Sequence, residues 1–239
     1  MKKQVSRYAG FFLIYGALAS VLLSCAAIDP AEKYPDMVAD MDPVSAGTVE
    51  VEFDRVFSSN VEKKEIEALF YPRYNTVALE FRHQTIRYRQ FWDLGGRQKF
   101  VQALERYKAD YAAKNLDNKF SKSRAAYGRF KGKTEWETFS FTIPGRAYPT
   151  MELGYRFRGK DNSSPYFSVL QQSAKDEYSF NSDNAKPDSL QIVMYYTRGQ
   201  ADGLAKIFDQ DFLLSLTGPV KTPESEAPVQ DEYYEYDEE

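Results

Sequence analysis

The chain has 239 residues, with 31 Lys and Arg, 35 Asp and Glu, one His and one Cys, and 43% of its residues are hydrophobic. A single cysteine excludes an intramolecular disulfide, and one histidine with one cysteine cannot supply a zinc site built from several such ligands, so we expect no metal and no cofactor. This length and hydrophobic content suit a folded domain with a substantial core.

The N-terminus has the organisation of an export signal. Lys2, Lys3 and Arg7 are positively charged, and an uncharged, mostly apolar stretch follows over residues 8–23. About 20 apolar residues are needed to cross a bilayer, so this shorter run predicts secretion rather than a stable membrane span.

The stretch ends in Leu22-Leu23-Ser24-Cys25, which places the chain's one cysteine directly after a small residue. This motif resembles the lipobox of bacterial lipoproteins, which is an aliphatic residue, two small residues and Cys. Leu23 is bulkier than usual, as in the looser lipoboxes of spirochaetal lipoproteins. The alternatives are a plain signal peptide cleaved near Ala26 and an uncleaved N-terminal anchor.

The resemblance implies that residues 1–24 are removed and that Cys25 becomes a mature N-terminus carrying several acyl chains. Each buried methylene contributes about 0.8 kcal/mol, so several chains would hold the protein firmly in a membrane. We therefore expect a protein of the cell envelope that faces outside the cytoplasm, with the outer membrane favoured over the inner.

Acidic segments flank the expected domain. Residues 26–46 contain three Pro, five acids and one Lys, so the lipidated segment 25–46 is predicted to be a tether. Residues 220–239 contain eight acids and one Lys and have no periodicity, which predicts a disordered acidic Tyr/Glu-rich tail. The remaining residues, 47–219, carry a net charge of +4 and are predicted to form a single domain.

Two patterns at the start of this domain predict a strand and a helix. Apolar residues at positions 49, 51 and 53 alternate with acids, which is typical of a strand with one buried face. Residues 60–70 predict a short helix that begins at Asn60 and ends before Pro72.

The next two extended segments, 77–82 and 86–89, differ in phase. The apolar positions are odd-numbered in the first and even-numbered in the second. A bulge or turn at 83–85 is therefore needed to keep one face buried. With it, one polar face would carry Arg82, Arg87 and Arg89.

Helical and extended patterns alternate through the rest of the domain. Gly95-Gly96 open a helix whose apolar residues recur every three or four positions through 100–111. The long extended stretch 127–143 changes phase and is expected to be bent or broken. The later predicted elements are strands at 151–157, 166–170 and 190–196, the last being central, and an amphipathic helix over 204–216.

These patterns predict an α+β domain: a curved, mostly antiparallel sheet of six to seven strands with two longer amphipathic helices. No βαβ alternation or internal repeat is present, which argues against a parallel doubly wound sheet. The long bent strands permit a half-open barrel with an aromatic-lined hollow.

Basic residues concentrate in the middle of the domain. Segment 82–133 has 14 Lys and Arg against four acids, a net charge of +10. Clustered cations attract anions, and Gly95-Gly96 at a helix start could add backbone N–H donors. The alternative is an ordinary solvated surface. The candidate anion-binding residues are Arg82, Arg87, Arg89, Arg97, Lys99, Arg129, Lys131 and Lys133.

The sequence thus predicts a non-catalytic binding or docking module anchored to a membrane. Its partner would be an anionic lipid, a glycan or an acidic protein segment, while nucleic acid is not expected outside the cytoplasm. The alternatives are a carrier of lipid or another hydrophobic ligand, with an aromatic-lined cavity under the sheet, and, more distantly, a hydrolase centred on His83. The module would use a basic face formed by residues 82–133. We also hypothesise that the acidic tail shields this basic face, in which case deleting residues 220–239 should raise affinity for a polyanion at low salt.

Overall fold

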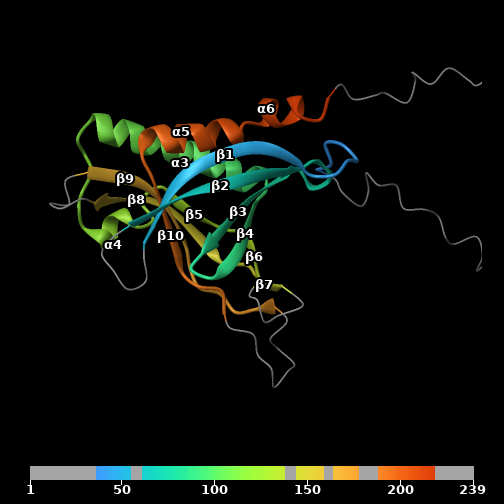
Figure 1. Ribbon diagram of the computed structural model, residues 1–239. Helices are drawn as coiled ribbons and strands as arrows, with labels where there is room; N and C mark the ends of the chain where they lie inside the picture. Colours follow the sequence, from blue (N-terminus) through green and yellow to red (C-terminus); the bar gives the residue numbers. More distant parts are fainter. Residues whose placement is uncertain (1–35, 55–60, 138–143, 159–163, 178–187, 219–239) are drawn as a thin grey trace, which may run out of the picture. The chain divides into compact units, whose positions relative to one another are not determined.

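The computed structural model describes residues 36–54, 61–137, 144–158, 164–177 and 188–218. From Met37 onwards the chain forms one compact unit, in which an antiparallel sheet curls into a half-barrel (Figure 1). The strands are β1 (Val44–Asp54), β2 (Val61–Tyr71), β3 (Thr76–His83), β4 (Ile86–Trp92), β5 (Gly128–Lys131), β6 (Lys133–Glu137), β7 (Gly145–Ala147), β8 (Thr150–Arg158), β9 (Ser164–Gln171) and β10 (Ile192–Tyr196).

The strand order explains the curl. It runs β5-β8-β9-β10-β1-β2-β3-β4-β6-β7, yet β5 and β6 are separated in the chain by Gly132 alone. In the same way, only Tyr148 and Pro149 separate β7 from β8. Since β5 pairs with β8 and β6 with β7, the sheet curls until its two ends meet at these bends.

The curved antiparallel sheet was predicted correctly, but the number of strands was not, because the described residues contain ten rather than six to seven. The predicted helix over 60–70 is wrong: this segment is β2, between β1 and β3. Its Ile66, Ala68 and Phe70 are fully buried and lie at every second position, as in a strand with one buried face. Packing of this face within the sheet decided the structure of the segment, despite the helix start that Asn60 suggested.

The predicted phase change and bend are both present. The β3–β4 hairpin turns at Gln84 and Thr85, with Gln84 in the left-handed region at φ 58°. The stretch after residue 127 breaks at Gly132 into β5 and β6, while the part of the prediction at 138–143 lies outside the described residues. The strand predicted at 190–196 is β10, between β9 and β1.

Helices cover one side of the sheet. α3 (Leu94–Ala112) begins as predicted, with the Asp93 side chain accepting a hydrogen bond from the Gly96 N–H. The second predicted long helix is instead two short ones, α5 (Arg198–Ile207) and α6 (Gln210–Ser215), because Asp209 caps a new helix start. A four-residue helix, α4 (Phe120–Ser123), and a 3₁₀ turn, η1 (Pro72–Tyr74), complete the described elements.

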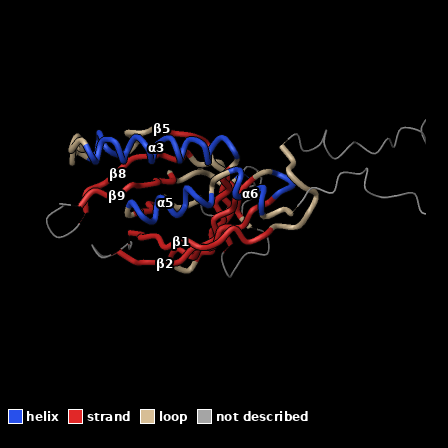
Figure 2. Tube along the Cα trace, turned by 90° about the horizontal axis from the view of Figure 1, so that it is seen from above, coloured by secondary structure: helices blue, strands red, loops and turns tan. Residues whose placement is uncertain are grey.

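Figures 1 and 2 show α3 and α5 side by side over the sheet. Phe100 of α3 is fully buried, and its ring packs edge-on against Trp92 and Phe167 at 5.8 and 5.3 Å between centroids. Burying one such side chain contributes about 1.5–3 kcal/mol. Aromatic rings therefore fill the space between the helices and the sheet.

The folded part begins earlier than predicted. β1 starts at Val44, and Ala46 is buried, so the sheet includes the last three residues of the segment expected to be a tether. In the part of the chain that the structure describes, no helix has the length and hydropathy needed to cross a membrane.

Candidate functional site

The β3–β4 hairpin places its charged residues on the outer face of the sheet. Its two-residue turn pairs Arg82 with Arg87 and Glu80 with Arg89 across the strands. Tyr88, Gln90 and Trp92 of β4 are buried, so the alternate side chains of this strand point outward. This confirms the prediction that Arg82, Arg87 and Arg89 share one face.

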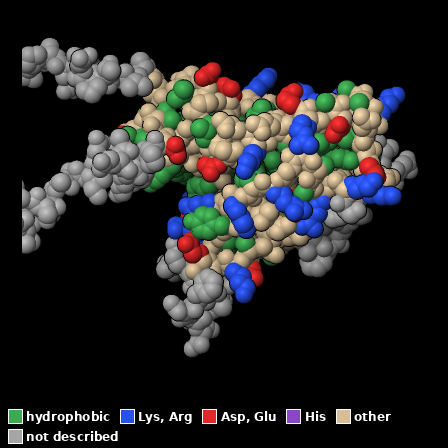
Figure 3. Space-filling view, turned by 180° about the vertical axis from the view of Figure 1, so that it is seen from behind, with side chains coloured by type: hydrophobic (Ala, Val, Ile, Leu, Met, Phe, Trp, Pro, Cys, Tyr) green, Lys and Arg blue, Asp and Glu red, His purple; other side chains and the backbone are tan. Residues whose placement is uncertain are grey.

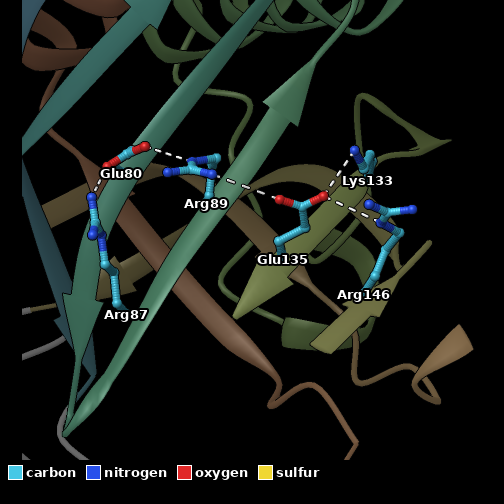
Figure 4. Close-up of polar contacts among 6 residues, drawn as sticks. All are labelled: Glu80, Arg87, Arg89, Lys133, Glu135 and Arg146. Carbon is cyan, nitrogen blue, oxygen red and sulfur yellow. Dashed lines mark hydrogen bonds and ion pairs between the residues drawn. The ribbon is translucent and has the colours of Figure 1, made fainter. Parts of the chain in front are cut away.

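Two glutamates hold a row of cations on this face (Figure 4). The Glu80 carboxylate accepts hydrogen bonds from Arg87 and Arg89 at 2.6 and 2.5 Å. On β6, Glu135 forms ion pairs with Lys133 at 2.9 Å, Arg146 at 3.2 Å and Arg89 at 3.7 Å. The row therefore crosses β3, β4, β6 and β7, with four cations to two carboxylates.

The same contacts set the charge of Glu80. Burial raises the pKa of this carboxyl, but the hydrogen bonds and the positive charges of Arg87 and Arg89 together lower it by more, so the pKa lies below its ordinary value. The Glu80 side chain is 9% exposed. It therefore acts as a fixed anion that orients two guanidinium groups.

A groove of about 490 Å³ opens beside this row, within the range of about 300–1,000 Å³ typical of small-ligand sites. It combines four aromatic side chains with three cations and two carboxylates. The lining residues are Tyr71, Tyr74, Thr76, Arg89, Phe91, Asp93, Lys131, Gly132, Lys133, Glu135 and Tyr148.

Aromatic rings form much of the groove wall. The Tyr71 and Phe91 rings lie 6.0 Å apart, and the Lys133 ammonium lies 4.3 Å from the centre of the Phe91 ring, a cation–π contact. Tyr74 and Tyr148 are each 51% exposed. The groove therefore presents ring surface to solvent next to positive charge.

Gly132 allows the bend that brings two of the cations to the groove. A Cβ at this position would lie 2.9 Å from Met151 Cγ, and the Gly132 N–H donates to the Pro149 carbonyl at 3.1 Å. A side chain would therefore push against the adjoining strand. On either side of this glycine, Lys131 and Lys133 both line the groove.

The predicted anion-binding residues separate into four groups, of which the buried Arg97 is one. Arg89, Lys131 and Lys133 line the groove, and Arg87 belongs to the ion-pair row beside it. Arg82, Lys99 and Arg129 are exposed but do not line the groove. Figure 3 shows Lys and Arg side chains interspersed with acidic and hydrophobic ones on the visible face, rather than gathered in one continuous patch.

Arg97 does not belong to the basic face, contrary to the prediction. Its side chain is buried at 1% exposure and donates hydrogen bonds to the carbonyl oxygens of Phe208 and Asn75 and to the side chains of Asn75 and Gln210. Since the helix start at Gly95-Gly96 turns this guanidinium into the protein, Arg97 joins η1, α3 and α6 instead of facing an external anion.

His83 lies in an apolar environment at the end of β3. It is 5% exposed, its ring centroid is 5.6 Å from that of Phe53, and its Nδ1 has no hydrogen-bond partner among the described residues. Burial, with a further effect of Lys64, lowers its pKa. The described residues also contain no group of three or more His, Cys, Asp or Glu that could hold a metal ion.

The aromatic half of the groove was not predicted, because the aromatic residues were assigned mainly to the core. One signal was available: Tyr148 directly precedes Pro149, and Tyr74 follows Pro72 by two residues, so both lie in connections between predicted elements, where side chains tend to be exposed. The acidic partners Glu80 and Glu135 were missed because both lie just outside segment 82–133. Cys25 and residues 219–239 lie outside the described residues.

Comparison with known proteins assigns the folded part to a family. A protein of Treponema pallidum (strain Nichols), described as "Uncharacterized protein", is 24% identical over 232 residues, which cover 91% of this chain and 80% of that protein. No solved structure matches the chain. The family model described as "Uncharacterised Treponema protein" matches residues 44–215, from the start of β1 to the end of α6, and the chain belongs to this family.

Proposed function

We propose that this protein is a lipid-anchored component of the cell envelope whose folded domain is a non-catalytic module that binds an anionic partner. The observation that carries the proposal is the row of four cations held by Glu80 and Glu135 on the outer face of the sheet. Fixed side chains lose little entropy on binding, and an excess of positive charge attracts anions.

The anchor is supported by two observations that do not depend on each other. Cys25 ends a signal of lipobox type, and its loose form resembles those of spirochaetal lipoproteins. The family that matches the folded domain is a family of Treponema, which is a spirochaete genus. Acylation of Cys25 and the outer membrane as its location remain predictions.

The packing beneath the sheet favours docking over carriage of a hydrophobic ligand. In the described residues, Phe100 of α3 occupies this space and contacts Trp92, Phe167, Tyr196 and Phe208. A carrier would instead need an open apolar cavity there. A hydrolase centred on His83 is disfavoured because no described partner orients the imidazole through Nδ1.

Binding to a sulfated polyanion such as heparin tests the proposed face. Replacing Arg87 and Arg146, the two cations of the row that do not line the groove, with Gln should weaken binding about tenfold in 50 mM salt. The difference should shrink at 300 mM because the attraction is screened. Lys108→Gln with Lys206→Gln is the matched control, since it removes two charges from α3 and α5. No heparin binding, or equal weakening by both pairs, would refute the proposal.

Mass spectrometry of the protein purified from its own envelope tests the anchor. A mass consistent with acylated Cys25 at the N-terminus is expected. A Cys25→Ser variant should lose the added mass and should no longer sediment with membranes. An unmodified N-terminus near Ala26 would instead indicate the plain signal peptide.

A further inference from the structure

We infer that the groove lined by Tyr74 and Tyr148 is a subsite for a carboxylate-bearing sugar residue of a glycan. This inference rests on the proposed function and specifies the chemistry of the anionic partner. It depends on three features of the groove: its aromatic walls, its modest net charge, and one cation whose neighbouring residues leave it available to bind an anion.

The exposed rings indicate what surface the ligand presents. Among the described residues, four large hydrophobic side chains are strongly exposed, and two of them, Tyr74 and Tyr148, line this one groove. Phe91 and Tyr71 add partly buried ring surface beside them. Single exposed aromatics are ordinary, but a cluster of them at a groove indicates a binding surface. The C–H face of a sugar ring is a suitable partner for such rings.

The charged groups argue against a hydrocarbon ligand and against a dense polyanion. Three cations line the groove. An acyl chain bound there would displace water from these cations and offer them no polar partner in return, so a hydrocarbon ligand is disfavoured. Asp93 and Glu135 line it as well and would repel closely spaced phosphates or sulfates. The net charge of the lining is +1, which suits a ligand of low charge density.

Carboxylates at the rim have a use when the ligand is a sugar. Hydroxyl groups donate hydrogen bonds, and Asp93 and Glu135 can accept them. Thr76 directs its own hydroxyl to the Tyr74 carbonyl at 2.9 Å, which fixes the connection that carries the Tyr74 ring. The groove thus offers acceptors for hydroxyls next to ring surface.

Lys131 is the cation best placed to meet the ligand's carboxylate. Arg89 is bound by Glu80 and Glu135, and Lys133 is bound by Glu135 and stacked on Phe91. Lys131 is exposed, and among the described residues its ammonium makes one long contact, at 3.5 Å, to the Tyr148 carbonyl oxygen. It therefore lies beside one of the two exposed rings with capacity for an anion.

Calorimetric titration of the full chain with trigalacturonic acid, and with galactotriose as its neutral counterpart, tests the inference. The acidic trisaccharide should bind, and the neutral one should bind at least fivefold more weakly. Tyr148→Ala should weaken binding of the acid at least tenfold, whereas Tyr148→Phe should retain it because the ring remains. Lys131→Met should abolish the preference for the acid over the neutral sugar.

Heparin binding by the same variants distinguishes a failure of this inference from a failure of the proposed function. Tyr148→Ala should leave heparin affinity within twofold. If heparin binds but trigalacturonic acid does not, or if Tyr148→Ala has no effect on the acid, the inference is wrong and the basic face stands. A peptide of residues 231–239 provides a further test. If this peptide occupied the groove and the sugar bound only at other sites, the inference would also be overturned.

Discussion

Arg97 and Lys131 belong to the same basic run of the sequence, but the fold gives them opposite environments. Arg97 is 1% exposed, and its guanidinium donates hydrogen bonds to four neutral oxygen atoms. Lys131 is exposed and, within the part of the chain that the structure describes, makes a single long contact, to a carbonyl oxygen. The comparison shows that local charge density in a sequence does not distinguish a structural cation from one available to a ligand, because burial decides between them.

The environment of Arg97 has an electrostatic cost that neighbouring charges reduce. Burial lowers its pKa to about 10, while the negative charges of Asp93 and Asp209 oppose that decrease. The guanidinium remains charged at neutral pH and ties the connection before β3 to the start of α6. Lys131 has no comparable cost, since water can solvate its ammonium.

Arg97→Met should have the largest effect on stability. It leaves the carbonyl oxygens of Asn75 and Phe208 without their donor in a buried site, and each unsatisfied group costs about 1–3 kcal/mol. We expect the free energy of unfolding in urea to fall by about 3 kcal/mol. Lys131→Met should change it by less than about 0.5 kcal/mol. Equal effects of the two variants would show that the contrast between the two sites is wrong.

Gly132→Ala tests whether the position of Lys131 depends on the bend. The added methyl would lie 2.9 Å from Met151 Cγ, and such overpacking costs about 1–3 kcal/mol. Binding at the groove should weaken as well, because the bend carries Lys131 and Lys133. Gly203→Ala in α5 is the control: its methyl meets nothing within 4 Å and should stabilise the protein by up to about 1 kcal/mol. If Gly132→Ala left the stability unchanged, β8 with Met151 would have moved to make room for the methyl group, and the bend would not depend on glycine.

The sequence allowed the outer face to be predicted where local periodicity decides the geometry. The phase change around residue 83 placed Arg82, Arg87 and Arg89 together, and the hairpin confirms it. The groove could not be predicted in this way, because its walls come from segments that meet only when the sheet curls. Tyr148 follows β7, whereas Phe91 belongs to β4, and the two are brought together through β6. Arg97 was misassigned because its charge was counted with the basic run, although it lies three residues before Phe100 and therefore on the buried face of α3.

Glu80 is the intermediate case, a mostly buried carboxylate that holds two partly exposed cations, and its effect should be the smallest. Its pKa is lowered from 4.5, so the stability that it contributes is present above pH 4.5 and is lost as the pH falls through the lower pKa of the folded protein. Glu80→Gln should destabilise the protein by about 1 kcal/mol at pH 7 and by progressively less in acid, as measured by urea unfolding between pH 3 and pH 7. Glu105→Gln on α3 removes the same charge from an exposed side chain and serves as the control. If the loss of unfolding free energy caused by Glu80→Gln did not change over this pH range, the negative charge of Glu80 would not be what holds Arg87 and Arg89, and the shape of the side chain would be responsible instead.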